Sequence, residues 1–366
     1  MHMKTILMSA SDFEMINEMK EIIAQKLEEW FGPGAVFDSG NPVLRQHPNS
    51  FMVRFRIQTP KGNEAVLVKI PSKPYFNSLH DAIASDTSKK RVDEQYSAAI
   101  AVWNAISEED DLTCFAIPAP LKIEKWNALV MQEIKGKMLK SFLLKPSIFW
   151  GSVSAWDSLV KSVMHSSRWL RIVHSRAGNI MVEPFPIEDV QALIDETLEK
   201  LDQDSDSQVD VQFYRGVLQK QLDVVSQSRV PVSLLHDDYH YSNILITPEG
   251  RACALDYALT NRGPIYVDIS TILIDPETRL AQIISLNKFL SQEKMAQLRQ
   301  LILDDYFQGQ QYDSQILNLF CAIAILYKWS VDERRFSSDG YQKLYSPLIK
   351  IVIRRHFQNV FKSYLN

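Results

Sequence analysis

The sequence has 366 residues, enough for two domains or two lobes, because domains commonly hold about 150 residues. Apolar residues make up 46% and charged residues 23%, ordinary values that exclude a disordered chain, a collagen and a coiled coil. The net charge of −4 lacks the basic excess typical of proteins that bind nucleic acid or an anionic membrane, so we expect neither partner.

Three further features narrow the class of protein. The 12 glycines are few, which argues against Gly-rich loops as the main phosphate-binding device. Cys114, Cys253 and Cys321 are far apart and odd in number, so we expect no disulfide framework and a reducing compartment. The longest apolar stretch, Leu317 to Trp329, is too short to span a membrane. We therefore expect a soluble cytoplasmic protein.

The first 133 residues have the pattern of a small β-rich lobe preceded by a helix. Ser11 and Glu14 have the spacing of a capping box, and apolar residues at helical spacing continue to Trp30, before Gly32-Pro33-Gly34. A polar loop is expected at 46–50, a mobile polar stretch at 79–90 and a helix at 92–106. Two hairpins are predicted, with strands at 51–57 and 65–70, and at 121–123 and 128–131.

Beyond residue 133 the periodicity is mostly helical. Helices are predicted at 153–174, 187–201, 211–226 and from 271 onward, a strand at 232–235, and a hairpin at 244–246 and 252–255. The acidic segment 202–210 is predicted to be a solvated loop. We infer an α+β fold with an N-lobe over 1–133 and a helical C-lobe over 134–366.

The residues that carry chemistry gather around the hairpin predicted at 244–255. Asp238 and Asn243 lie on the loop before it, and Asp256 follows it. A hairpin brings its two ends together, so Asn243 and Asp256 are expected to be neighbours. An amide oxygen and a carboxylate suit Mg²⁺, and Asp238 is placed to accept a proton from a substrate hydroxyl.

This pattern resembles that of the aminoglycoside phosphotransferase and choline kinase group, which has a two-lobed protein-kinase-like fold. The group carries His-x-Asp-x-x-x-x-Asn and a later Asp followed by an aromatic residue, here His236, Asp238, Asn243, Asp256 and Tyr257. Further matches in chain order are Val66-Leu67-Val68-Lys69, Glu94, the run 129–136, Val173-His174, and Gly263-Pro264 with Asp268. Agreement in order at several places makes the resemblance specific.

The resemblance implies an ATP- and Mg²⁺-dependent kinase, with GTP as a second candidate donor. The acceptor would be a hydroxyl of a small molecule such as a sugar, an aminoglycoside or an amino alcohol. Lys69, oriented by Glu94, would hold the α- and β-phosphates, and Asp238 would align or deprotonate the acceptor hydroxyl.

The remaining roles follow from the same resemblance. Asn243 and Asp256 would hold Mg²⁺, while His236 and Asp268 would be structural. Nucleotide contacts are implied for the backbone of Gln132, Glu133 and Ile134, and for Asn49 and Ser50 in place of glycines.

Several alternatives remain open. Asp237 stands where the group usually has a small residue, and its carboxylate either disturbs Asp238 or points away. Asp93 is a second candidate for the partner of Lys69. The main alternative function is a catalytically silent kinase-like protein that binds a nucleotide or a partner.

Two weaker patterns complete the set of candidates. His236 and His240 are four residues apart, which resembles a zinc motif, although the strand-like flanks favour His240 as a loop residue near the site. Asp332 and Glu333 are candidates for binding a polar or cationic acceptor.

Overall fold

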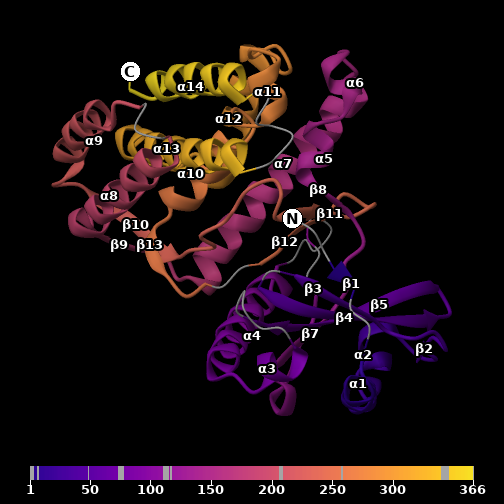
Figure 1. The fold of residues 1–366 in the computed structure, drawn as a ribbon. Coiled ribbons are helices and arrows are strands. Elements are labelled where there is room, and N and C mark those ends of the chain that lie inside the picture. Colours follow the sequence, from indigo (N-terminus) through magenta and orange to yellow (C-terminus); the bar gives the residue numbers. More distant parts are fainter. Residues whose placement is uncertain are drawn as a thin grey trace. The chain divides into compact units, whose positions relative to one another are not determined.

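The computed structural model describes residues 4–5, 8–47, 49–72, 78–109, 115, 118–205, 209–256, 259–338 and 346–365. The chain divides into two compact units, Met1–Leu112 with Ala116–Lys135 and Thr113–Phe115 with Gly136–Asn366. We call them the N-terminal unit and the C-terminal unit. Figure 1 shows long strands in the first and mostly helices in the second.

Seven strands of the described residues form one antiparallel sheet in the N-terminal unit, in the order β1-β3-β4-β5-β7-β6 with β2 paired to β4. They are β1 (Lys4–Thr5), β2 (Val36–Phe37), β3 (Val43–His47), β4 (Ser50–Thr59), β5 (Gly62–Pro71), β6 (Pro120–Ile123) and β7 (Ala128–Gln132). The β4–β5 and β6–β7 pairs confirm the two predicted hairpins. The expected polar loop at 46–50 is shorter than predicted, because β3 continues to His47 and β4 begins at Ser50.

One face of this sheet carries the core of the N-terminal unit. The helices of the unit are α1 (Ala10–Ala24), α2 (Leu27–Phe31), α3 (Leu79–Ile83) and α4 (Asp86–Ser107). Alternate β4 residues Phe51, Val53 and Ile57 are fully buried and pack with Met19 and Ile23 of α1 in one cluster. The alternation of apolar side chains along β4 therefore produces a one-sided apolar layer that α1 covers.

The start of α1 differs from the prediction. The capping residue is Ser9, whose Oγ accepts the Asp12 N–H at 3.2 Å, while the Asp12 carboxylate accepts the Ser9 N–H at 2.8 Å. The capping box therefore lies two residues before the predicted pair Ser11 and Glu14. The helix also breaks at Gln25, so the predicted continuous helix to Trp30 is two helices.

The polar stretch at 79–90, which we expect to be mobile, is mostly helical in the structure. It contains α3 and the first turn of α4. Ser78 caps α3 by accepting the Asp81 N–H at 3.1 Å, and Leu79 and Ala82 are buried in the core cluster. Polar residues of this stretch such as His80, Asp81, Lys89 and Lys90 lie on the exposed faces of α3 and of the first turns of α4.

The C-terminal unit contains two small antiparallel sheets. One has the order β12-β11-β8 and the other β13-β10-β9. The strands are β8 (Lys137–Met138), β9 (Met181–Pro184), β10 (Arg229–Leu234), β11 (Ile244–Ile246), β12 (Ala252–Ala254) and β13 (Arg262–Pro264). The β11–β12 pair is the hairpin predicted next to the chemistry-bearing residues.

Helices make up the rest of the C-terminal unit. They are α5 (Leu139–Leu143), α6 (Pro146–Phe149), α7 (Val153–Ile172), α8 (Ile187–Asp204), α9 (Val211–Val225), α10 (Tyr266–Ile274), α11 (Leu280–Ile284), α12 (Gln292–Phe307), α13 (Ser314–Ser338) and α14 (Ser346–Ser363). A π turn, Val173–Ala177, extends α7. Helix α8 continues to Asp204, so only the later part of the predicted loop at 202–210 is not helical, and residues 206–208 of it lie outside the described residues.

Helix α13 packs against α8, α10 and α14. Among the described residues it is the helix that is long and apolar enough to cross a membrane, over Ser314–Arg335, and 61% of that apolar window is buried inside the unit. Trp329 and Leu326 are fully buried. The apolar stretch 317–329, expected to be too short to span a membrane, thus belongs to a longer helix whose burial is that of a core helix.

Candidate active site

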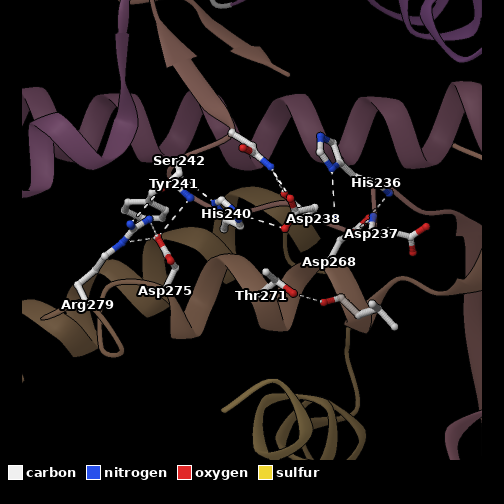
Figure 2. Close-up of polar contacts among 12 residues, drawn as sticks. His236, Asp237, Asp238, His240, Tyr241, Ser242, Asp268, Thr271, Asp275 and Arg279 are labelled. Carbon is white, nitrogen blue, oxygen red and sulfur yellow. Dashed lines mark hydrogen bonds and ion pairs between the residues drawn. The ribbon is translucent and has the colours of Figure 1, made fainter. Parts of the chain in front are cut away.

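The loop 235–243 connects β10 to β11 and carries most of the predicted chemistry. Its turn is closed by two backbone hydrogen bonds, from the His240 N–H to the Asp238 carbonyl at 3.1 Å and from the Asn243 N–H to the His240 carbonyl at 2.8 Å. Figure 2 shows the labelled side chains of this loop above α10, from which Asp268 and Thr271 come.

Asp268 anchors one end of the loop from the first turn of α10. Its Oδ2 accepts the His236 N–H at 2.7 Å and its Oδ1 accepts the Asp237 N–H at 2.9 Å (Figure 2). The Asp268 side chain has no exposed surface. A buried carboxylate that accepts successive backbone N–H groups holds the loop in one conformation.

Asp268 also binds the end of α7. His174 Nε2 lies 2.9 Å from Asp268 Oδ2, and His174 Nδ1 lies 2.6 Å from the Tyr306 hydroxyl on α12. A carboxylate only accepts, so the hydrogen of His174 lies on Nε2. The π turn at 173–177 directs His174 inward, where it is fully buried.

Asp238 and Asn243 are in direct contact. Asn243 donates from Nδ2 to the Asp238 carboxylate at 2.7 Å and to the Asp238 carbonyl oxygen at 3.1 Å. The Asp238 side chain is 62% exposed, so its carboxylate is accessible to a substrate. His240 Nε2 lies 3.1 Å from the other carboxylate oxygen (Figure 2).

The surroundings of Asp238 favour its ionised form. The partial loss of water around the carboxylate opposes ionisation, but the interactions of the carboxylate with His240, Asn243 and His236 together outweigh it. The pKa of Asp238 therefore lies below its ordinary value, and the group is a carboxylate at neutral pH.

The β11–β12 hairpin brings Asn243 next to Leu255, the residue that precedes Asp256. The Leu255 N–H donates to the Asn243 carbonyl at 2.8 Å, next to the register pair Ile244 and Ala254. Asp256 is exposed and has φ of 57°. An exposed carboxylate and an amide oxygen at one hairpin end are a donor set that fits Mg²⁺. Tyr257, the aromatic residue of the motif, lies outside the described residues.

Asp237 points away from Asp238. Its Oδ2 accepts a hydrogen bond from Asn261 Nδ2 at 2.6 Å, and Figure 2 shows its carboxylate on the opposite side from Asp238. Loss of water and the nearby charge of Asp268 raise the pKa of Asp237 to about 6. Its φ of 67° lies in the left-handed region that glycine adopts most easily and that Asp tolerates better than most residues.

His236 and His240 have different surroundings. His236 is buried, with its ring against Trp169 and Tyr239, and burial lowers the pKa of His236 even though Asp268 and Asp238 counteract it. His240 is partly exposed and faces Asp238. In the part of the chain that the structure describes, no three His, Cys, Asp or Glu side chains form a cluster that could hold a metal ion.

Sequence reasoning missed a second anchor under the loop. Asp275, at the end of α10, accepts the Tyr241 N–H at 3.2 Å and is paired with Arg279, whose Nη1 donates to Ser242 Oγ at 3.1 Å (Figure 2). Asp275 and Arg279 are four residues apart, a spacing typical of a helical ion pair. That spacing was the only signal in the sequence, and it does not indicate a contact with residues 241 and 242.

The candidate phosphate-binding residues lie in the N-terminal unit. Lys69 is on β5, opposite Met52 of β4 and Leu129 of β7, and alternation places it on the face away from the buried Val68 and Ile70. On α4, Glu94 lies 3.8 Å from Lys90, which is four residues away.

The alternative partner, Asp93, lies 2.6 Å from Lys122 of β6. Asn49 lies between β3 and β4 and is exposed, whereas Ser50 is the first residue of β4 and is buried. The Asn49 carbonyl accepts the Ser72 N–H at 2.8 Å, which holds this segment to the end of β5.

Gln132 is the last residue of β7, and Glu133 and Ile134 follow it. The Glu133 N–H donates to the Ala65 carbonyl at 2.9 Å, and its carboxylate accepts from Arg54 Nε at 2.8 Å and Arg54 Nη2 at 2.6 Å. Gln132 Nε2 donates to the Trp30 carbonyl at 2.8 Å. The side chains of both residues therefore stabilise the segment, whereas Ile134 is half-buried.

The acidic pair on α13 is part of the core. Glu333 is fully buried and accepts hydrogen bonds from Arg354 Nε at 2.7 Å and Trp329 Nε1 at 3.2 Å. Asp332 is also buried, and burial raises its pKa. Glu333 has a structural partner in α14, which accounts for its charge without a bound acceptor.

Comparisons with known proteins give fold matches alone. No family model matches the sequence, and no curated protein matches it. A glucosamine kinase solved with glucosamine, ADP and inorganic phosphate aligns with a TM-score of 0.55 and 11% identity, over 95% of this chain and 88% of that chain. A macrolide 2'-phosphotransferase type I aligns with a TM-score of 0.50 and 12% identity, over 93% and 97%. The chain has a protein-kinase-like fold.

The fold expected from the resemblance to the aminoglycoside phosphotransferase and choline kinase group is thereby confirmed. A choline/ethanolamine kinase family protein from Mesorhizobium loti also aligns, with a TM-score of 0.47 and 15% identity over 94% of this chain and 99% of that chain. The loop 235–243 joins the two small sheets of the mostly helical C-terminal unit, from β10 to β11.

Proposed function

We propose that this protein is an ATP- and Mg²⁺-dependent phosphotransferase that moves the γ-phosphate of ATP to a hydroxyl of a small molecule. The acceptor class is a sugar, an aminoglycoside, an amino alcohol or a similar compound, and GTP is an alternative donor. The observation that carries the proposal is the contact of the exposed Asp238 carboxylate with Asn243 at 2.7 Å, on a loop held by the buried Asp268.

Each predicted residue receives a role in this proposal. Asp238 aligns the acceptor hydroxyl and accepts its proton, for which an accessible ionised carboxylate is suited. Asn243 and Asp256 would hold Mg²⁺, which when bound neutralises charge on the transferring phosphoryl group. His236 and Asp268 brace the loop from within the protein.

The nucleotide would be held by residues of the N-terminal unit. Lys69, with Glu94 as its orienting partner, would bind the α- and β-phosphates. Asn49 and Ser50 would contact phosphates, and the backbone of residues 132–134 would contact the base.

The buried free thiols Cys253 and Cys321 agree with a reducing, ATP-containing compartment such as the cytoplasm.

The orientation of Asp237 supports catalysis over the silent alternative. A carboxylate directed at Asp238 would raise the pKa of that base by repulsion between like charges. Asp237 is instead bonded to Asn261, and the pKa of Asp238 is lowered.

The test is thermal melting of the full-length protein with MgATP, followed by phosphate transfer to a panel of hydroxyl compounds. A ligand at about 100 times its Kd stabilises the native state by about 2.7 kcal/mol, which for a protein of this size corresponds to a rise in Tm of about 3–4 °C. We expect the rise to be lost in Lys69→Ala and Asp256→Ala.

Two exposed residues at β-turns supply matched controls. Lys61→Ala, in the β4–β5 turn, and Glu249→Ala, in the β11–β12 turn, remove the same charges and should keep the full shift. Asp238→Asn should keep the shift and lose transfer. Binding of MgATP without turnover by the wild-type protein, with any acceptor, would favour the silent kinase-like alternative.

A further inference from the structure

His240 lies where a side chain can hold the reacting carboxylate. It is on the loop 235–243, between Asp238 and Asn243, and its Nε2 lies 3.1 Å from Asp238 Oδ1. Its side chain is 27% exposed, so it lies at the surface of the loop next to the accessible Asp238. Figure 2 shows the His240 ring directed at Asp238.

The other ring nitrogen fixes the tautomer of His240. Its Nδ1 accepts the Ser242 backbone N–H at 3.1 Å. A ring nitrogen that accepts a hydrogen bond carries no hydrogen, so the hydrogen of the neutral ring lies on Nε2. The Asp238 carboxylate can only accept, and the ring therefore donates to it.

Residues that play no part in transfer hold the Ser242 backbone in place. Arg279 Nη1 donates to Ser242 Oγ at 3.1 Å, and Arg279 is paired with Asp275. Asp275 also accepts the Tyr241 N–H at 3.2 Å. Backbone and ring thus form one chain of hydrogen bonds from α10 to Asp238 (Figure 2).

Each oxygen of the Asp238 carboxylate then has one donor. Asn243 Nδ2 holds Oδ2 at 2.7 Å, and His240 Nε2 holds Oδ1 at 3.1 Å. Two donors on opposite oxygens resist rotation of the carboxylate, and they leave lone pairs free for a substrate hydroxyl. Such preorganisation favours transfer because the base needs no reorientation when the acceptor arrives.

We propose that His240 is a positioning residue for phosphoryl transfer, whose neutral ring donates from Nε2 to Asp238 and fixes the direction of that carboxylate. The role rests on the proposed function, since it acts through Asp238. The neutral tautomer and its two hydrogen bonds do not depend on the reaction, so they are tested separately.

The first test is ¹⁵N NMR of the histidine rings in the full-length protein at pH 7.5, without nucleotide. The signal of His240 is assigned by its loss in His240→Gln. We expect a neutral ring with hydrogen on Nε2. A hydrogen on Nδ1, or a charged ring, would overturn the proposed donation to Asp238.

The second test measures turnover of MgATP by two readouts. One is hydrolysis, seen as release of inorganic phosphate, and the other is phosphate transfer to any acceptor found in the panel. His240→Phe keeps the ring shape and removes the donor, and we expect kcat to fall about 10- to 100-fold with the KM for MgATP within about twofold of the wild-type value. His240→Gln places an N–H near the Nε2 position and should recover most of the loss.

His80→Ala is the matched control, because His80 also faces a carboxylate, that of Asp12 at 3.6 Å, on the surface of the N-terminal unit. It should leave kcat unchanged. Equal turnover by His240→Phe and wild type would overturn the positioning role alone. A folded wild-type protein that binds MgATP and transfers phosphate to nothing would overturn the proposed function and the positioning role with it, even with the expected tautomer.

Discussion

His174 Nε2 and Asp268 Oδ2 lie 2.9 Å apart, and neither side chain has any exposed surface. This pair joins the end of α7 to the first turn of α10. The same carboxylate holds the backbone of His236 and Asp237, so a single buried group determines where the loop 235–243 begins.

Asp268→Asn should therefore destabilise the C-terminal unit. The Asn side chain presents an N–H₂ group to at least one of three donors, which leaves buried polar groups without acceptors. We expect the free energy of unfolding to fall by about 3 kcal/mol, measured by urea denaturation. Asp157→Asn, an exposed change on α7, should change it by less than about 0.5 kcal/mol. Equal effects of the two variants would contradict the anchoring role of Asp268.

We expect the stability of the protein to differ between glycine and alanine at position 237. With φ of 67°, a left-handed residue with a Cβ costs roughly 1 kcal/mol more than glycine. Asp237→Gly and Asp237→Ala both lose the hydrogen bond from Asn261, so their difference isolates the backbone contribution. We expect the Ala variant to be the less stable by about 1 kcal/mol in denaturant titrations. Equal stability of the two variants would show that the loop relaxes.

Substitution by alanine should have opposite effects on stability at Gly178, which follows the π turn, and at Gly216, which lies within α9. A Cβ at Gly178 would lie 1.8 Å from Ser233 Oγ and 2.8 Å from Leu234 N, so Gly178→Ala should cost about 1–3 kcal/mol by overpacking. A Cβ at Gly216, within α9, would meet nothing within 4 Å, so Gly216→Ala should stabilise by up to about 1 kcal/mol. The melting temperatures of the two variants, measured beside that of the wild type, show whether each change stabilises or destabilises the protein.

Acidification should destabilise the protein through its buried histidines. Burial lowers the pKa of His236 and of His356 below the ordinary histidine value, so the unfolded chain takes up protons near pH 6.5 that the folded chain does not. The contribution of these two histidines to the free energy of unfolding is then fully present above about pH 6.5 and falls below it, by up to about 1.4 kcal/mol per pH unit for each histidine. Urea midpoints at pH 7.5 and 5.5 should differ less for His356→Asn than for the wild type. An unchanged difference would place the acid sensitivity elsewhere.

The sequence predicts the elements of this fold better than their exact ends. The β4–β5 and β11–β12 hairpins follow from alternation and turn residues, which are local signals. The boundary errors at Ser9 and at 79–90 lie at the polar starts of helices, because capping by Ser9 and Ser78 decides where α1 and α3 begin. Such capping contacts depend on one hydrogen bond each, and several residues nearby could make them equally well.

From the sequence, the residues of the candidate site can be predicted only where they belong to a recognisable motif. The motif places Asp238 and Asn243 on one loop, and in the structure they are in direct contact. The support by Asp275, Arg279 and Tyr306 joins residues 34 to 132 positions apart in the chain, and no local pattern encodes such contacts. The ring orientation of His240 likewise depends on a hydrogen bond from the Ser242 backbone N–H, and the sequence does not predict backbone contacts of this kind.

The π turn at 173–177 has a consequence for changes in chain length. A π turn holds one residue more than the α-helical turn it replaces. Deletion of a single residue from it would restore regular α-helical winding and rotate the following chain by about 100° around the helix axis. His174 or Gly178 would then leave its close contact with Asp268 or with β10. This junction should accept many changes of side chain on its exposed face, yet reject an insertion or deletion of even one residue.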